Sequence, residues 1–347
     1  MAYDFASDNA AVVDPRVMAA IAACNDGFVP PYGADELSSR LNRTYSAVFE
    51  REVSVFPVSS GTAANGLSLG AVTPSYGTVF CHEMAHIVGS EAGSVEFYSG
   101  GGRLVMFPGE GAKLSAAALD AKLKGFGPSF LHQMHASTVS VTQATERGTV
   151  YSLDELQAIG EVARRGGLKM HMDGARFANA LAKLGVTPAQ MTWKAGVDIL
   201  SLGTTKNGTM MAEAVIVFDK ALAEAVRFKH KRAGFLHSKM RYFAAQLHAY
   251  VESDLWLENA RKANATAARL ATALAATPGV ELAYPVETNQ IFVHLPDAVT
   301  KAFAAEGLNV RPWASSRPGL HRMVASYCDP EALVARVERA LATVGKG

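Results

Sequence analysis

Short apolar runs rich in β-branched residues alternate with amphipathic stretches through the first two-thirds of the chain, and this alternation restricts the possible folds. The pattern favours an α/β fold, with a mainly parallel sheet sandwiched by helices. The expected strands are residues 53–58, 79–81, 104–107, 138–141, 168–172, 197–202 and 214–218.

One helix in this alternating part of the chain has a recognisable N-terminal cap. Ser152 and Glu155 match a capping box, and an apolar face follows at helical spacing with Leu156, Ile159 and Val162. These residues lie between the fourth and fifth expected strands, so they predict a crossover helix.

The pattern changes near residue 253. A long Ala-rich helical stretch continues to residue 276, and β-like runs follow at 290–295 and 322–326. A chain of 347 residues exceeds the usual size of one compact domain. We therefore expect a large domain of residues 1–252 and a smaller α+β domain of residues 253–347. The last expected helix has Asp329 as cap, Pro330 as first residue, and Leu333, Val334, Val337 and Leu341 on its apolar face.

Charge and cysteine usage limit the class of partner. The chain has 33 Lys and Arg against 32 Asp and Glu, a net charge of +1, so no overall field attracts nucleic acid or an anionic membrane. We expect a small-molecule ligand. Cys24, Cys81 and Cys328 are odd in number and far apart, which fits a reducing cytoplasm better than a disulfide framework or a zinc cluster. The N-terminus lacks the features of a signal peptide, and no apolar run approaches the ~18 residues of a membrane span.

Two residues that follow expected strands suggest a pyridoxal phosphate site. Asp173 comes after the fifth run, and Lys206 comes after the sixth. A lysine amine can hold the cofactor aldehyde as a Schiff base, and an aspartate at a strand end can keep the pyridine nitrogen protonated. Neither residue decides the matter alone, because a lone Lys is usually a surface charge and a lone Asp after a strand usually caps a helix.

Residues 55–65 predict a strand, a tight turn and the start of a helix. Free backbone amides at such a helix start, with the hydroxyls of Ser60 and Thr62, form a seat for a phosphate group. The segment has neither the P-loop pattern nor that of dinucleotide folds. Ordinary helix capping explains the same turn.

A competing signal lies in residues 82–86, where His82, Glu83 and His86 satisfy the His-Glu-x-x-His pattern of zinc peptidases. That chemistry needs both imidazoles on one helix, one turn apart. Gly89 and Gly93 would interrupt such a helix soon afterwards. A core or surface role for His82 is therefore the preferred interpretation, and no metal is expected.

Seven segments occur in an order that resembles a known family: residues 7–9, 32–33, 60–65, 86–93, 171–176, 205–208 and 322–326. Together they are similar to the low-specificity L-threonine aldolases, which are pyridoxal phosphate enzymes of the aspartate aminotransferase-like fold. The resemblance covers nearly the whole chain. Its more specific parts are the Asp-Gly-Ala-Arg segment that contains Asp173 and the segment around Lys206.

The resemblance implies roles for these residues. Lys206 would hold the cofactor, Asp173 would pair with its ring nitrogen, and His86 would stack on its ring. Ser60, Gly61 and Thr62 would bind the phosphate, with Arg176 and Thr205 as further cofactor contacts. A cation reaching the phosphate is expected from Lys231, Arg232 or Lys239, and Arg232 stands for this open set. Ser7, Tyr32, Arg176 and Arg322 would bind the substrate, whose α-carboxylate suits a guanidinium because that group grips both oxygens. Considered without the resemblance, Arg322 fits a surface ion pair.

The chain departs from the family pattern at two places. Many members carry Asn-Thr-His before a glycine, whereas residues 144–148 are Ala-Thr-Glu-Arg-Gly, so one histidine thought to meet the substrate hydroxyl is missing. This departure leaves recognition of the hydroxyl open. Asn207 follows the lysine in place of glycine, and Thr205 precedes it where serine is common; both replacements are compatible with the site.

The expected reaction is retro-aldol cleavage of a β-hydroxy-α-amino acid, such as L-threonine, L-allo-threonine or phenylserine, to glycine and an aldehyde. His86 is the expected acceptor of the β-hydroxyl proton. A β-eliminating lyase of the same fold is the alternative, and a zinc metalloprotease or a non-catalytic cofactor-binding module is more remote. A homodimer or homotetramer with shared active sites is expected by analogy.

Overall fold

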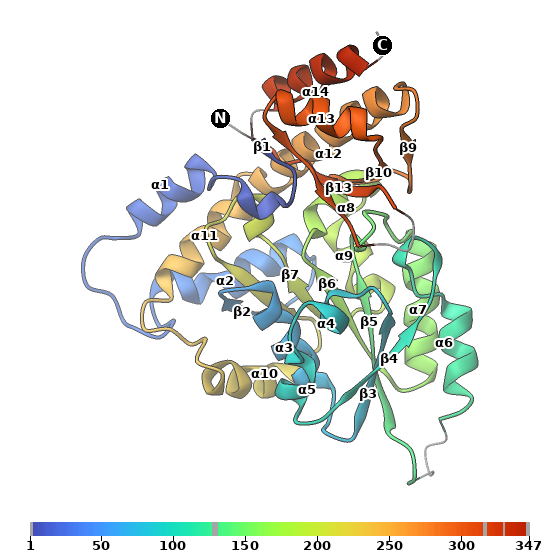
Figure 1. The fold of residues 1–347 in the computed structure, drawn as a ribbon. Coiled ribbons are helices and arrows are strands. Elements are labelled where there is room, and N and C mark those ends of the chain that lie inside the picture. The colour runs from blue at the N-terminus through green and yellow to red at the C-terminus, as the bar shows by residue number, and fades with distance from the viewer. Residues whose placement is uncertain (1–2, 127–130, 315–317, 329, 345–347) are drawn as a thin grey trace.

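A seven-stranded sheet forms the centre of the computed structural model, which describes residues 3–126, 131–314, 318–328 and 330–344 (Figure 1). The strand order is β2-β8-β7-β6-β5-β3-β4. All seven expected strands are present, which confirms the predicted fold class. Their bounds are β2 (Ser54–Val58), β3 (Gly77–His82), β4 (Arg103–Phe107), β5 (His135–Thr142), β6 (Lys169–Gly174), β7 (Ile199–Leu202) and β8 (Glu213–Val217).

Strand direction brings several strand ends to one edge of this sheet. β8 runs antiparallel to its two neighbours, β2 and β7, whereas the other neighbouring pairs are parallel. Two reversals restore the direction, so β2 points the same way as β7. The carboxyl ends of β2, β3, β5, β6 and β7 therefore lie along the same edge, which is where ligands bind in open α/β sheets.

Helices cover both faces of the sheet, and side chains of the strands alternate between them. In β8, Ile216 belongs to the core on one face, while Val215 and Val217 pack with α3 on the other. The first face is covered by α2 (Glu36–Val48), α6 (Ala116–Leu123), α7 (Leu153–Arg165), α8 (Phe177–Leu184), α11 (Arg241–Glu252) and the first turns of α12 (Leu255–Ala275). The second is covered by α3 (Gly61–Val72), α5 (Ser94–Ser99) and α10 (Lys220–Arg232).

The predicted helix starts and stops are largely confirmed. α7 begins with the capping box between Ser152 and Glu155. The Ala-rich stretch is α12. The remaining helices are α1 (Pro15–Ala23), α4 (His86–Gly89), α9 (Pro188–Met191), α13 (Asp297–Ala305) and α14 (Pro330–Val344), with single 3-10 turns η1 (Asp8–Ala10), η2 (Glu110–Ala112), η3 (Trp193–Ala195) and η4 (Thr205–Asn207).

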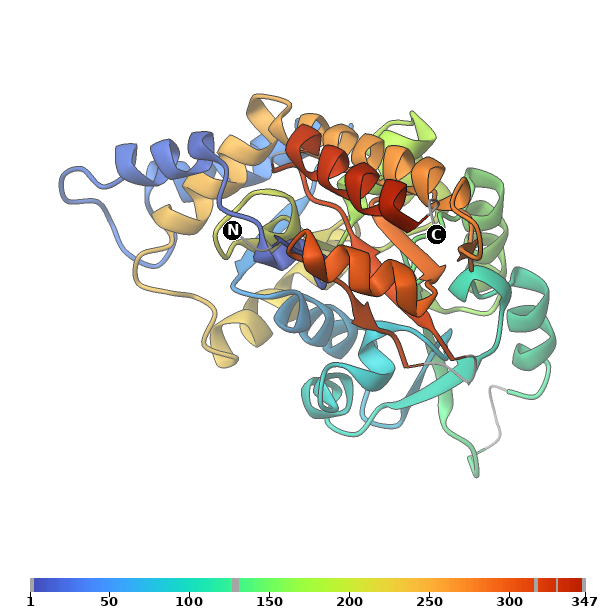
Figure 2. The ribbon, with the colours of Figure 1, turned by 45° about the horizontal axis from the view of Figure 1, so that its top comes forward.

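A smaller antiparallel sheet has its own core near the C-terminus. Its strand order is β12 (Arg311–Pro312), β13 (Leu320–Val324), β10 (Gln290–His294) and β9 (Glu281–Leu282). α12, α13 and α14 pack against it (Figure 2), and the four predicted apolar residues of α14 all belong to this core. The expected cap Asp329 lies outside the described residues. No helix in the described ranges has the length and apolarity that crossing a membrane requires.

The N-terminal segment contacts this second core. β1 (Tyr3–Asp4) pairs in parallel with β11 (Leu308–Asn309), and Phe5 is buried among the residues of the smaller core. In Figure 2 the N-terminal segment lies beside the C-terminal helices. A domain boundary near residue 252 stays a proposal.

Candidate active site

A cavity of about 300 Å³ opens at the carboxyl edge of the large sheet. Segments that follow β2, β3, β5, β6 and β7 form its wall, so residues far apart in the sequence meet there. The predicted site residues in this wall are Ser60, Gly61, Thr62, His86, Asp173, Arg176, Thr205 and Lys206.

The start of α3 provides a seat for an anion. Ser60 is the N-cap, and its Oγ accepts a hydrogen bond from the Ala63 amide at 3.2 Å. The first amides of a helix have no partner within the helix, and the helix dipole favours negative charge there. A Cβ placed on Gly61 would meet no atom within 4 Å, so the space in front of these amides is open. The geometry fits a phosphate group.

Lys206 lies in the η4 turn after β7. No hydrogen bond or ion pair joins its Nζ to another residue of the described ranges. The buried Glu213 lies in the same wall and accepts the Thr204 amide at 2.7 Å. Burial raises the pKa of Glu213, and the positive charge of Lys206 is among the groups that oppose this rise. The lysine amine is thus available for a ligand.

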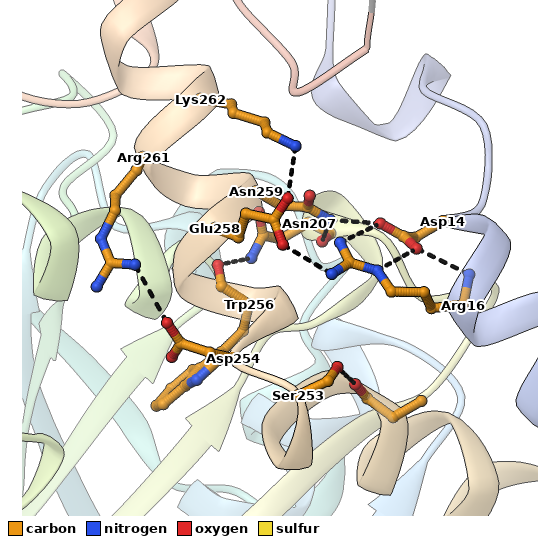
Figure 3. A network of polar contacts seen from close by, with 11 residues as sticks. Asp14, Arg16, Asn207, Ser253, Asp254, Trp256, Glu258, Asn259, Arg261 and Lys262 are labelled. Atoms are coloured by element: carbon orange, nitrogen blue, oxygen red, sulfur yellow. Dashed lines mark hydrogen bonds and ion pairs between the residues drawn. The ribbon is translucent and has the colours of Figure 1, made fainter.

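Asn207 fixes the turn that carries Lys206 (Figure 3). Its Nδ2 donates to the Trp256 carbonyl at 2.8 Å, and also to the Tyr250 hydroxyl at 2.9 Å. Asn259 of α12 donates to the Asn207 carbonyl at 3.2 Å and to Asp14 at 3.1 Å. The residue that departs from the family pattern therefore anchors the turn to α12.

Gly208 makes this close approach possible. Its φ of +125° is rarely adopted by residues with a side chain. A Cβ at this position would lie 2.9 Å from Nδ2 of Asn259. Both the backbone conformation and the contact with α12 therefore require glycine next to Asn207.

Asp173 ends β6 and is buried. Its Oδ1 accepts the Ala175 amide, and its Oδ2 accepts Nδ2 of Asn65, both at 2.9 Å. Asn65 also donates to Oε1 of Glu91 at 2.8 Å. Asn65 and Glu91 belong to the segments that resemble the family, but the resemblance implied no role for either residue. The structure shows that Asn65 connects the two carboxylates.

His86 begins α4 and is held by Glu91. Its Nδ1 lies 2.7 Å from Oε1 of Glu91, whose other oxygen accepts the Ser94 hydroxyl at 2.9 Å. This hydrogen bond to Glu91 raises the pKa of His86, although burial opposes the rise. The Glu91 side chain therefore keeps a proton on Nδ1 and orients the ring.

The zinc-peptidase geometry is absent at residues 82–86. His82 ends β3, where its Nε2 lies 3.1 Å from the Gly109 carbonyl and its Nδ1 accepts the Met84 amide at 3.0 Å. His86 belongs to the separate helix α4. The two imidazoles are therefore not one turn apart on one helix, because a strand end and a turn separate them. The described residues also contain no group of three potential metal ligands among His, Cys, Asp and Glu.

Glu146 is part of the cavity wall, although its sequence position indicated only a departure from the family. Its Oε1 accepts the His86 amide and the Thr142 hydroxyl, both at 2.9 Å. Its Oε2 is buried without a partner among the described residues. Burial, followed by the negative charge of Asp173, raises the pKa of Glu146 to about 7.

Arg176 reaches the cavity in an ion pair with Asp8. The Nε and Nη2 atoms donate to the two oxygens of Asp8 at 2.8 and 2.9 Å. Asn289 donates to the same carboxylate at 3.0 Å. Burial acts to raise the pKa of Asp8, but the charges of Arg176 and Lys206 oppose this effect, and the pKa is lowered overall.

Arg322 and Ser7 lie near the site but are not in the cavity wall. Arg322 donates to the Ala6 carbonyl at 2.7 Å, and its guanidinium carbon lies 4.5 Å from the Trp313 ring centre. Burial and the charge of Arg176 lower the pKa of Arg322 to about 10. No ion pair joins Arg322 to a carboxylate of the described residues. The Ser7 hydroxyl accepts the Asn9 amide, and Asn9 itself lines the cavity.

Tyr32 and Arg232 lie away from this cavity. Tyr32 is exposed, and Nζ of Lys231 lies 4.9 Å from its ring centre. Arg232 lines a separate depression that includes Tyr98 and Lys229. The structure of one chain does not bring these two residues to the other site residues, and their roles stay predictions.

The fold and the cavity define a class: α/β chains in which a lysine, an aspartate and a helix start meet at the carboxyl edge of the sheet. The family model of the beta-eliminating lyases matches residues 4–298. The low-specificity L-threonine aldolase of Pseudomonas aeruginosa is 43% identical over 304 residues, covering 87% of each chain. That of a Pseudomonas species is 40% identical over 331 residues, covering 95% of this chain and 94% of the relative. The chain belongs to the beta-eliminating lyase family, together with the low-specificity L-threonine aldolases.

Solved structures agree with this assignment. The threonine aldolase of Leishmania major has a TM-score of 0.91 at 26% identity and covers 99% of both chains. An aspartate aminotransferase from Rhodobacter sphaeroides has a TM-score of 0.70 at 17% identity, over 100% of this chain and 94% of its own. The second similarity concerns the fold alone. The predicted family and fold are confirmed.

Proposed function

We propose that the protein is a pyridoxal phosphate-dependent aldolase that cleaves L-threonine, L-allo-threonine and related β-hydroxy-α-amino acids to glycine and an aldehyde. The observation that carries this proposal is the meeting of Lys206, Asp173 and the start of α3 in one cavity. The relatives that cover most of the chain are threonine aldolases by name, which supports the same reaction class.

The residues present fit the cofactor. The helix start at Gly61, which borders open space, suits its phosphate, and among the described residues the amine of Lys206 has no partner that would compete for its aldehyde. Asp173 can hold a proton on the ring nitrogen, since the Ala175 amide and Asn65 fix its two oxygens. Pyridoxal phosphate, when bound, supplies an electron-withdrawing ring that accepts the electron pair of a broken bond at the substrate Cα.

Arg176 in the cavity wall, with Arg322 near it, suits the substrate carboxylate. Asp8 occupies Nε and Nη2 of Arg176, so Nη1 is the nitrogen that remains for a ligand. Arg322 lies close enough for the charge of Arg176 to lower its pKa. Two neighbouring guanidinium groups favour an anion between them. Holding the carboxylate there would orient the bond that breaks.

Acetaldehyde release tests the proposal. Purified protein with added pyridoxal phosphate is given L-threonine and L-allo-threonine separately, and the aldehyde is measured with coupled alcohol dehydrogenase. We expect acetaldehyde and glycine in equal amounts, and none from a Lys206→Ala protein. If neither substrate gives aldehyde, and phenylserine gives none, the aldolase proposal is wrong.

The same assay separates the alternative reaction. A β-eliminating lyase would produce a keto acid and ammonia from a hydroxy amino acid, without glycine. The family description favours keeping this candidate, because it is named for that reaction. A homodimer or homotetramer, and a cytoplasmic location, remain parts of the proposal that await measurement.

A further inference from the structure

Glu146 combines a buried carboxyl group with an unused acceptor. Oε1 already accepts the His86 amide and the Thr142 hydroxyl, whereas Oε2 has no hydrogen-bond partner in the described ranges. Buried polar atoms of native proteins are nearly always paired, so an unpaired one needs an explanation. Glu146 lines the cavity, and although Oε2 itself is covered, a turn of the side chain would present it to a donor group on a bound molecule.

The surroundings of Glu146 do not indicate a structural ion pair. No Lys or Arg of the described residues forms a salt bridge with it. Its neighbour Arg147 instead lies over the rings of Tyr284 and Phe292, at 5.0 and 5.1 Å from their centres. Oε1 holds the start of α4 to the end of β5 through the His86 amide and the Thr142 hydroxyl, whereas Oε2 has no such structural contact among the described residues.

The groups around Glu146 favour proton exchange near neutral pH. Asp173 of β6 acts with burial to raise its pKa to about 7, while hydrogen bonds from His86 and Thr142 oppose the rise. The pKa values of Cys81 in β3 and of Tyr151 are raised mainly by burial, and the negative charge of Glu146 adds to the rise. A general base works best when its pKa lies near the operating pH.

His86, the acceptor expected from the sequence, is less suited to the task. Its Nδ1 is already engaged by Glu91, and this contact raises the pKa of the imidazole. With Nδ1 engaged, Nε2 is the ring nitrogen left to meet a ligand. His86 and Glu146 are joined through the His86 amide, so both occupy the same part of the wall.

We propose that Glu146 accepts the proton of the substrate β-hydroxyl through Oε2. The inference rests on the aldolase function proposed above. The O–H bond breaks as its proton moves to Oε2, and the oxygen electron pair forms the carbonyl of the aldehyde. The Cα–Cβ bond breaks, its electron pair stays with Cα, and Cα then takes up a proton from solvent to complete glycine. Since Oε1 already accepts two hydrogen bonds, the proton is directed to Oε2.

The test compares Glu146→Gln with Glu83→Gln, which alters an exposed carboxylate in the neighbouring segment. Glutamine keeps the shape and an acceptor oxygen but cannot take the proton. We expect kcat for L-threonine to fall by about 100-fold or more in Glu146→Gln, within the usual range for loss of a general base. Glycine has no β-hydroxyl, so its dissociation constant should be unchanged. Glu83→Gln should match the native protein in both measurements.

Infrared spectroscopy adds a measurement that needs no turnover. Difference spectra of the native cofactor-free protein across a pH series should show a buried carboxylic acid that titrates with a midpoint near 7. Glu146→Gln should lack this band. Absence of the band from the native protein would overturn the proposal even if the variant failed to fold.

The activity measurements distinguish a wrong assignment of Glu146 from a wrong aldolase function. If the native protein and Glu146→Gln cleave L-threonine equally fast, the assignment of Glu146 is wrong and the aldolase function stands. If the native protein releases no aldehyde from any β-hydroxy amino acid, the proposed function is wrong, and the role of Glu146 is refuted with it.

Discussion

Asp8 binds Arg176 through both carboxylate oxygens, at 2.8 and 2.9 Å, in a nearly buried ion pair. Asp8 belongs to the N-terminal segment, whereas Arg176 follows the end of β6. Asn289, next to β10, donates to the same carboxylate. This contact therefore joins three distant parts of the chain beside the cavity, and Asp8 engages Nε and Nη2 of Arg176 but not Nη1.

Replacing Asp8 with asparagine should destabilise the protein. The side chains of Asp8 and Arg176 are 1% and 11% exposed, and removing one partner of a buried pair leaves the other charge uncompensated. The expected loss is about 3 kcal/mol in the free energy of unfolding. Urea denaturation of the cofactor-free protein measures it. Asp120→Asn, which removes an exposed partner of Arg165, is the control and should change stability little.

The same pair predicts a pH dependence. The pKa of Asp8 is lowered in the folded protein, so its contribution to stability is present above the pKa of the unfolded chain. That contribution is lost as pH falls through the folded pKa. The stability difference between native protein and Asp8→Asn should therefore shrink in acid. A difference that stays constant with pH would show that the charge of Asp8 is not what stabilises the fold.

Replacing Glu91 with glutamine should lower the pKa of His86. The hydrogen bond from His86 to the Glu91 carboxylate is the main cause of the raised value, and an amide oxygen binds an imidazolium more weakly. NMR titration of the His86 ring measures the change. Glu96→Gln, at an exposed position of α5, is the control and should leave the titration unaltered. An unchanged His86 in Glu91→Gln would refute this cause.

Replacing Asp173 with asparagine should affect catalysis far more than folding. Asparagine still offers an oxygen to the Ala175 amide, but it cannot hold a proton on a ring nitrogen through a negative charge. The expected loss is about 100-fold in kcat for L-threonine, comparable to removal of one preorganised electrostatic group. The apparent Tm serves as the check on folding. Full activity in a correctly folded variant would contradict the role of Asp173.

The strands and the central site residues could be predicted because their signals are local. Each expected strand of the large sheet is a short apolar run; Asp173 follows one such run directly, and Lys206 lies four positions after the end of another. The direction of β8 could not be predicted, because an antiparallel strand buried on both faces has the same composition as a parallel one. The pattern at residues 82–86 was misleading because His82 completes β3 and cannot belong to a helix.

The contacts that define the rest of the site are not local. Asp8 and Arg176 are 168 positions apart, and the His86 amide and Glu146 are 60 apart. Oε2 of Glu146 has no partner among the described residues, at a place where the ends of β3, β5 and β6 meet in one cavity wall. The sequence indicates only that residues 144–148 depart from the expected family pattern, and the burial that changes the pKa of Glu146 depends on the folded sheet.

The burial of Glu146 predicts that the Glu146→Gln protein gains stability relative to the native protein as pH rises, although it is expected to lose activity. The pKa of Glu146 rises from 4.5 to about 7 on folding, so the folded state holds this proton more tightly than the unfolded state. Its contribution to stability is present below the unfolded pKa and is lost as pH rises through the folded pKa. At about 1.4 kcal/mol per pKa unit, the native protein loses on the order of 1 to 3 kcal/mol that Glu146→Gln, which does not titrate, retains. In urea denaturation of the cofactor-free proteins, Glu146→Gln should therefore gain stability relative to the native protein between pH about 5 and pH about 8. A stability difference that does not change over this interval would show that Glu146 ionises as readily in the folded protein as in water, and would remove the reason to assign it a proton near neutral pH.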